Sequence, residues 1–161
     1  MKMAKDTKTN AMRILDREKI NYKVNLYECD EFIDGVSIAD MLGQEYERSY
    51  KTLVLRGKSG ANYVCVIQIH REIDLKAAAR EFGEKSVEMI HVKELLGLTG
   101  YIRGGCTSIG MKKQFRTIID ITAQEQDEII ISGGRIGAQI LLSPADLCKV
   151  TRGGFADIQM K

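Results

Sequence analysis

The spacing of apolar residues along the chain predicts several short helices. In each of them apolar positions recur every three to four residues, so that they share one face. A residue that commonly caps helix N-termini precedes three of these segments, and a glycine ends two of them. The expected N-caps are Thr9, Ser37 and Asp74, and the closing glycines are Gly43 and Gly83. A helical turn is also expected at 92–96.

Shorter apolar runs, alternating or continuous, predict a larger number of strands. The runs 50–55 and 63–69 flank a Gly-Lys-Ser-Gly turn, which indicates a hairpin. Further strands are expected at 23–27, 87–90, 117–121, 128–132 and 138–142. Strands outnumber helices, and short turns join most of them. The pattern predicts an α+β fold with a mixed, barrel-like β-sheet flanked by helices.

A last helix is expected after the final strand run. Ser143 can cap it, Pro144 suits its first turn, and Asp146 lies three residues after the cap, as in an acidic capping box. The cap explains Asp146 without any further role.

Three Gly-Gly pairs interrupt the pattern in the C-terminal part of the chain: Gly104-Gly105, Gly133-Gly134 and Gly153-Gly154. Doubled glycine at a strand end indicates positive φ or a close backbone approach. Two interpretations remain open. The pairs are ordinary tight turns, or they expose backbone N–H groups to an anion or a carbonyl.

The charge pattern adds a candidate binding surface. No Asp or Glu occurs between Leu95 and Ile119, whereas Arg103, Lys112, Lys113 and Arg116 fall within that window. The net charge of the whole chain is only +2. Any contact with a polyanion must therefore come from this local cluster rather than from the overall charge.

Composition narrows the function classes. The 161 residues, 44% of them hydrophobic, are expected to form one domain spanning 1–161. No apolar run approaches the roughly 20 residues of a membrane span, and no apolar segment follows the opening stretch 1–6 to make a signal peptide. We therefore expect a cytoplasmic protein with no membrane or DNA partner. The four cysteines and two histidines lack metal-ligand spacing, and nucleotide-binding motifs are missing, so we expect no metal and no cofactor.

Two residues are candidates for chemistry. Cys106 follows a Gly-Gly pair, but no histidine lies nearby in sequence to activate its thiol. Lys51 opens a strand and shares a face with Leu53 and Leu55, which should point inward. An unpaired buried ammonium is costly, so this placement suggests a cation at the floor of a pocket. The alternative is a lysine at a strand end whose ammonium reaches water.

Motifs along nearly the whole chain resemble the YbaK/EbsC family. They are Ser-Tyr-Lys-Thr-Leu at 49–53, Thr-Gly-Tyr-Ile-Arg-Gly-Gly at 99–105, Ile-Ser-Gly-Gly at 131–134, Ser-Pro-Ala-Asp-Leu at 143–147 and Phe-Ala-Asp-Ile at 155–158. Members of this family are free-standing relatives of the editing domain of bacterial prolyl-tRNA synthetases. The resemblance implies a trans-acting deacylase that removes cysteine from Cys-tRNA(Pro), and also from Cys-tRNA(Cys), with the mischarged acceptor end as its partner and prolyl-tRNA synthetase as a recruiting protein.

The resemblance also implies roles for individual residues. Lys51 matches the family's essential lysine, and no protein nucleophile is needed because the substrate's own thiol attacks the ester. The positions that match the substrate pocket are Tyr27, Phe32, Gly104, Gly105 and Asp146. The cations Arg103, Lys112, Lys113, Arg116 and Arg135 would hold the acceptor phosphates.

Two departures from the family pattern concern specificity. The usual Gly-Gly-Ile-Ser-Pro-Leu-Gly loop reads Gly-Gly-Cys-Thr-Ser-Ile-Gly at 104–110, and Gly-Gly-Lys-Arg-Gly reads Gly-Gly-Arg-Ile-Gly at 133–137. The first change removes a rigid proline and the second removes one positive charge. A deacylase for alanine or another small amino acid, and a non-catalytic module that binds RNA or a synthetase, therefore stay open as alternatives.

Overall fold

The computed structural model describes residues 8–161, in which the chain forms five α-helices of eight residues each and two β-sheets. The helices are α2 (Asn10–Arg17), α3 (Gly35–Leu42), α4 (Leu75–Phe82), α5 (Val92–Thr99) and α6 (Pro144–Thr151). The 3₁₀ helices are η1 (Tyr46–Arg48) and η2 (Ile121–Glu125). The strands are β1 (Lys23–Leu26), β2 (Tyr50–Gly57), β3 (Asn62–Gln68), β4 (Val87–Met89), β5 (Arg116–Asp120), β6 (Ile129–Ser132), β7 (Ala138–Leu142) and β8 (Gly154–Ala156).

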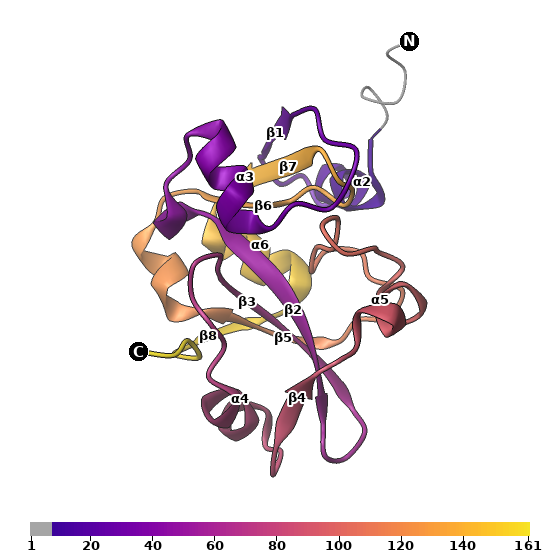
Figure 1. Cartoon of the computed structure of the whole chain (residues 1–161), viewed down its shortest axis with the longest axis vertical. Coiled ribbons are helices and arrows are strands. Elements are labelled where there is room, and N and C mark those ends of the chain that lie inside the picture. Colours follow the sequence, from indigo (N-terminus) through magenta and orange to yellow (C-terminus); the bar gives the residue numbers. More distant parts are fainter. Residues whose placement is uncertain (1–7) are drawn as a thin grey trace.

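The strands form a mixed α+β arrangement, as expected. A five-stranded sheet has the order β4-β2-β3-β5-β8, and a three-stranded sheet has the order β1-β7-β6 (Figure 1). In the large sheet, β5 runs parallel to both β3 and β8, whereas the other pairs are antiparallel. A parallel bridge between Ser49 and Ile130 joins the two sheets where β2 begins.

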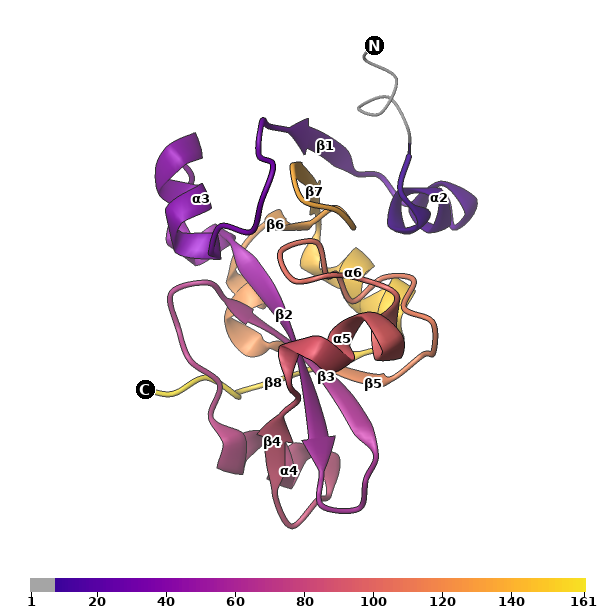
Figure 2. The same ribbon diagram turned by 45° about the vertical axis from the view of Figure 1, so that its right-hand side comes forward.

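Helices and the small sheet cover the two faces of the large sheet. On one face, α4 packs Ala78 and Phe82 against Leu55 and Ile67. On the other face, α2, α6 and the small sheet build a second cluster around Ile119. Figure 2 shows α5 lying across the front of β2 and β3, and α3 beside the start of β2. These two helices flank the region in which the candidate site is found.

Local sequence signals explain most of the element boundaries. The side chains of Thr9, Asp74 and Ser143 accept hydrogen bonds from backbone N–H groups in the first turns of α2, α4 and α6, which confirms three expected caps. One expected cap is wrong. Asp34, not Ser37, caps α3, because its carboxylate accepts the N–H of Ser37 at 3.0 Å and the helix begins at Gly35.

Two further boundaries depart from the expectation. Helix α5 continues beyond the expected turn at 92–96 and ends at Thr99, and Gly100 forms the C-cap with a positive φ of 87°. Strand β8 was not expected. The opening residues 1–6, on which the expectation of no signal peptide rests, lie outside the described part of the chain. Between residues 8 and 161, no helix has the length and apolar character that a membrane span requires.

Candidate functional site

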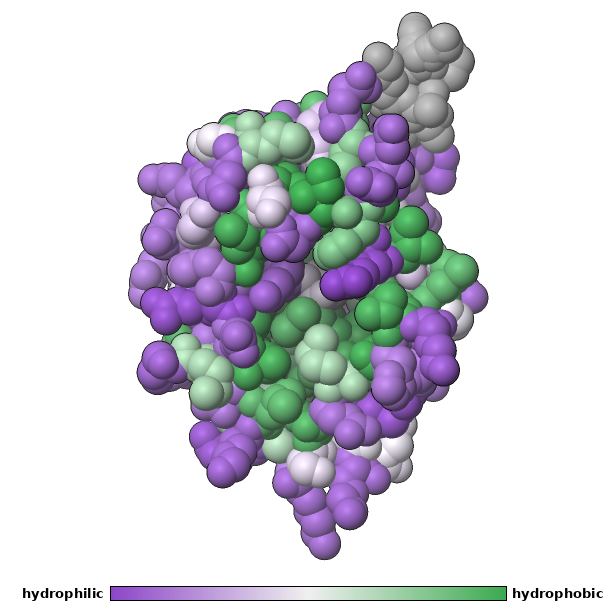
Figure 3. Space-filling view, in the orientation of Figure 1, coloured by the Kyte–Doolittle hydropathy of each residue, from purple (hydrophilic) through white to green (hydrophobic). Residues whose placement is uncertain are grey.

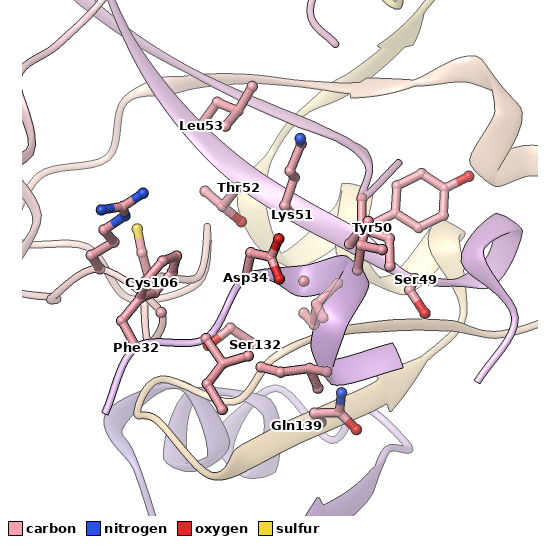
Figure 4. Close-up of a pocket in the computed structure, with 18 of the residues that line it drawn as sticks. Phe32, Asp34, Ser49, Tyr50, Lys51, Thr52, Leu53, Cys106, Ser132 and Gln139 are labelled. Carbon is pink, nitrogen blue, oxygen red and sulfur yellow. The ribbon is translucent and has the colours of Figure 1, made fainter. Parts of the chain in front are cut away.

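A cavity of about 470 Å³ opens on the face shown in Figure 3, where apolar residues gather around a hollow. Its walls come from α3, β2, β4, α5, β6, β7 and the loops that carry Phe32 and Arg103. Each of these elements is fixed by the sheet pairing or by a helix cap. The cavity therefore brings together segments that are distant in sequence (Figure 4).

Lys51 lies on the cavity wall, on strand β2 between Tyr50 and Thr52. Its side chain is half-buried, and no carboxylate of the described residues lies within 4.0 Å of its ammonium nitrogen. Burial lowers the pKa of Lys51, and this effect is opposed by the charges of Glu72 and Asp34. The cavity thus holds a cation that no ion pair neutralises.

Two acidic residues, Glu72 and Asp34, raise the pKa of Lys51 by their charge, and Asp34 is the one that lines the cavity. Figure 4 shows Asp34 near the backbone end of Lys51, with the ammonium nitrogen of Lys51 pointing the other way. Hydrogen bonds from Ser37 lower the pKa of Asp34, and the charge of Lys51 adds to the effect. Gly35 allows this placement, because a Cβ there would lie 2.9 Å from Cγ2 of Ile69. Sequence reasoning missed Asp34, although an Asp before a helical run is a common cap signal.

Arg103 and Phe32 form one edge of the cavity. The guanidinium carbon of Arg103 lies 4.0 Å from the centroid of the Phe32 ring, within the range of a cation–π contact. Gly104 permits this stacking: its φ is +87°, and a Cβ there would lie 3.0 Å from Cδ1 of Phe32. Phe32, Arg103 and Gly104 all line the cavity, as does Tyr27, whose pKa burial raises.

The glycine pairs serve close packing more than anion binding. A Cβ at Gly105 would lie 2.8 Å from Cα of Arg135, so this glycine lets two loops touch. Its N–H donates to the carbonyl of Ile102 at 3.0 Å, and the N–H of Gly133 donates to Ala138 at 2.8 Å. These N–H groups are used inside their own turns. For Gly105 and Gly133 this favours the tight-turn interpretation of the two that the sequence left open.

Cys106 lines the cavity but lacks the features of a nucleophile. Burial raises the pKa of its thiol to about 12, so the thiolate is scarce near neutral pH. No histidine occurs among the described residues of the cavity wall. Between residues 8 and 161, no three His, Cys, Asp or Glu side chains are grouped to hold a metal ion.

A network of amides fixes the wall opposite β2. Gln139 and Gln44 exchange hydrogen bonds through their side chains at 2.8 and 3.1 Å, and Asn25 donates to Gln139 at 2.9 Å. Ser132 lies directly across from Gln139 in the β6–β7 register and also lines the cavity. Sequence reasoning could not find this network, because Gln44 and Gln139 are 95 positions apart.

Other predicted site residues lie outside the cavity wall. Asp146 is in the first turn of α6, where its backbone N–H donates to the Ser143 side chain at 3.1 Å. Arg116 donates to the carbonyls of Glu81 and Phe82 at the end of α4. Of the predicted tRNA-binding cations, Arg103 alone lines the cavity.

Three of the predicted cations remain, and they have different surroundings. Lys112 donates to the carbonyl of Gly97 at 3.5 Å, and Lys113 is exposed nearby in sequence. Arg135 packs its backbone on Gly105, and its Nη2 atom is buried without a hydrogen-bond partner among the described residues. Of all the predicted cations, Arg116 is the one whose guanidinium donates to the carbonyl end of α4.

The sequence matches proteins of known family. The model of the aminoacyl-tRNA editing domain matches residues 35–150. A protein of Enterococcus faecalis (strain ATCC 700802 / V583) named "Putative Cys-tRNA(Pro)/Cys-tRNA(Cys) deacylase EbsC" is 45% identical over 155 residues, covering 96% of this chain and 94% of its own length.

Solved structures share the fold. A hypothetical protein has a TM-score of 0.87 at 20% identity, covering 94% of this chain and 100% of its own. A "putative trans-editing enzyme for prolyl tRNA synthetase" has a TM-score of 0.80 at 22% identity, covering 96% of this chain and 100% of its own. At these identities the likeness concerns the fold alone, and it agrees with the mixed α+β architecture expected from the sequence.

Proposed function

Because the chain belongs to the aminoacyl-tRNA editing domain family, we propose that it is a trans-acting deacylase that hydrolyses Cys-tRNA(Pro) and Cys-tRNA(Cys). The 45% identity to a relative with that name supports this substrate choice. The observation that carries the proposal is the half-buried ammonium of Lys51, which lies in a cavity without an ion-pair partner.

Such an enzyme is needed because a binding pocket has limited selectivity between amino acids of similar size. Cysteine and proline are similar in size, and a small apolar pocket separates such substrates by only about 1–3 kcal/mol. A second site that hydrolyses the wrong ester makes up the shortfall. The chemistry required is ester cleavage, for which a positioned cation and a shaped cavity are sufficient protein contributions.

The proposed reaction uses the substrate's own thiol. Its sulfur forms a bond to the ester carbonyl carbon, the bond from that carbon to the ribose oxygen breaks, and the thiol proton passes to the departing ribose oxygen. The products of this step are free tRNA and a cyclic thioester of cysteine, which water then opens to cysteine. No side chain of the protein is acylated, consistent with the protonated thiol of Cys106.

Lys51 is the residue to which we assign the principal role. Its ammonium would donate to the carbonyl oxygen as negative charge develops there, in a cavity where burial strengthens such an interaction. The charges of Glu72 and Asp34 would favour the charged form of this lysine without neutralising it in a short ion pair. Phe32 and Arg103 would cover the acceptor end at the edge of the cavity.

The decisive experiment is a deacylation assay. Wild type should hydrolyse purified Cys-tRNA(Pro), and Lys51→Ala should reduce the single-turnover rate at least about a hundredfold, the range lost with one electrostatic donor. Ala-tRNA(Pro) should resist the enzyme, because alanine has no thiol. An unchanged rate for Lys51→Ala would remove the lysine from the mechanism. Hydrolysis of the alanyl ester would favour a different deacylase.

We further propose that the enzyme acts in the cytoplasm, in association with prolyl-tRNA synthetase. A net charge of +2 gives little general attraction to RNA. Delivery by a synthetase that already holds the tRNA would offset this weakness. Co-elution of the protein with prolyl-tRNA synthetase and tRNA(Pro), compared with the protein and tRNA(Pro) alone, measures that contribution.

A further inference from the structure

The cavity has one polar part and one apolar part. Lys51, Asp34 and Gln139 belong to the polar part, on β2, the α3 N-terminus and β7. The apolar part is lined by Met89 of β4 and by Val92 and Leu95 of α5. Together with Leu96, these three residues form what we call the apolar shelf. Core packing does not account for the shelf. Met89, Val92 and Leu96 keep 45%, 58% and 55% of their surface exposed.

The shelf is rigidly attached to the sheet. Met89 pairs with Leu55 in the β2–β4 register, and the N–H of Ile90 donates to the carbonyl of Val54 at 3.2 Å. Arg56 on β2 and Glu94 on α5 form an ion pair at 2.7 Å. An exposed apolar surface that is held in place beside a cavity is typical of a binding groove.

The position of the shelf fits one nucleoside. Val54 and Leu55 are three and four residues along β2 from Lys51, about 10–13 Å at about 3.3 Å per residue. The cavity volume of about 470 Å³ lies in the range of pockets that enclose drug-sized molecules. A cysteinyl group is much smaller than that. A ribose and base attached to the ester held at Lys51 would account for the remaining space.

Charges around the shelf suit an RNA chain. Lys112 donates to the carbonyl of Gly97 within α5, and Lys93 is exposed on the same helix. Arg103 lies on the cavity edge. The one carboxylate in the first turn of α5, Glu94, is paired with Arg56. Cations thus flank an apolar surface. Proteins hold unpaired bases with cations that contact the backbone and with stacking against aromatic or apolar side chains.

Resting on the proposed deacylase function, we infer that the apolar shelf of Met89, Val92, Leu95 and Leu96 binds the base of the 3′-terminal nucleotide of the charged tRNA. The base lies flat on the aliphatic side chains while the attached ester reaches Lys51. The protein would then recognise the terminal nucleoside together with the amino acid, and a simple ester of cysteine would be a poor substrate.

The test uses uncharged RNA, so that binding is separated from catalysis. An acceptor minihelix of tRNA(Pro) with its CCA end is compared with the same minihelix lacking the terminal base. Wild type should bind the complete minihelix at least about fivefold more tightly, and Val92→Ser and Leu96→Ser should bring that ratio close to one. Ile121→Ser, which alters an apolar residue 46% exposed on η2, is the matched control and should keep the wild-type ratio.

Methyl NMR signals of Val92, Leu95 and Leu96 should shift on addition of the complete minihelix and stay in place with the abasic one. Equal affinity of wild type for both minihelices, or no binding of either, would overturn the inference. Thermal unfolding of each variant checks that the fold is kept. Hydrolysis of Cys-tRNA(Pro) by wild type reports separately on the proposed function, since a shelf that binds the base does not itself require turnover.

Discussion

At the scale of single residues, the central feature is a lysine that the fold half-buries without an ion-pair partner. Burial lowers the pKa of Lys51, which means that the folded chain disfavours its charged form. A side chain kept for stability would not be placed in this way. This cost makes a prediction about stability that is independent of activity.

Lys51→Met should not lower the stability of the protein at pH 7. Below the folded-state pKa both states carry the proton, and the folded state carries the full desolvation penalty. As the pH rises through the lowered folded-state pKa toward the ordinary value of 10.5, the folded lysine loses its proton first, so wild type gains stability. Thermal unfolding should therefore show a variant at least as stable at pH 7 and a difference that shrinks toward pH 10.5. A variant that melts well below wild type at pH 7 would contradict this account.

Cys106→Ser should change the deacylation rate by no more than about threefold. Burial raises the thiol pKa to about 12, so a reactive thiolate is rare at the working pH. Single-turnover hydrolysis of Cys-tRNA(Pro) measures the effect. Iodoacetamide should also label Cys106 slowly at pH 8. A loss above about a hundredfold in the serine variant would mean that the protein's own thiol attacks the ester.

The sequence predicted part of the candidate site and missed another part for physical reasons. Lys51 could be found because its charge breaks an apolar strand face, and Gly104 because doubled glycine marks close contact. Ser132 and Gln139 have no feature in the sequence that distinguishes them from other strand residues. Their place in the cavity depends on strand register and on an amide pair with Gln44, which form only when distant segments meet.

At the scale of elements, capping chemistry decides where the helices flanking the site begin. Asp34 starts α3 beside the cavity, and Ser143 starts α6 on the far side of the small-sheet cluster. In both caps the side chain accepts a backbone N–H three residues later, but the two caps differ in their relation to the cavity. The Asp34 cap places a carboxylate at the cavity, where its charge raises the pKa of Lys51, whereas the Ser143 cap binds the backbone N–H of Asp146.

Asp146→Asn and Ser143→Ala should affect stability and leave catalysis unchanged. Removing the charge from the first turn of α6 should cost about 0.3–1 kcal/mol, and removing the capping hydroxyl about 0.5–2 kcal/mol. Urea unfolding gives these values. The kcat for Cys-tRNA(Pro) should stay within about twofold of wild type for both variants. A large fall in kcat for Asp146→Asn at unchanged stability would mean that Asp146 takes part in the reaction.

The boundaries of the helices and strands show which local sequence signals predict the structure and which do not. The Thr9, Asp74 and Ser143 caps formed as expected because each is followed by a clear apolar helical face. The α3 boundary moved to Asp34, since Ser37 competes with an equally good cap three residues earlier. Strand β8 escaped sequence reasoning because Gly154 weakens its local pattern. It exists through parallel pairing with β5.

At the scale of the whole molecule, the distribution of cations matters more than their sum. The sequence groups Arg103 and Arg116 in one acid-free stretch, but the fold separates their roles. Arg103 stacks on Phe32 at the cavity edge. Arg116 donates to the carbonyls of Glu81 and Phe82, where a positive charge stabilises the C-terminal end of α4.

This separation gives a matched pair of variants for RNA binding. Each cation that neutralises a phosphate of single-stranded RNA steepens the salt dependence of binding, with a slope of about 0.7 in log K against log salt. Arg103→Gln should weaken binding of the tRNA(Pro) acceptor minihelix. It should also reduce the slope by about 0.7, the contribution of one phosphate contact. Arg116→Gln should leave both quantities unchanged and lower the unfolding temperature instead, because it removes contacts to α4. Affinities measured between about 50 and 200 mM salt decide the matter. Equal changes in slope for the two variants would mean that RNA spreads over the whole acid-free stretch, and that the edge formed by Arg103 and Phe32 has no special part in holding it.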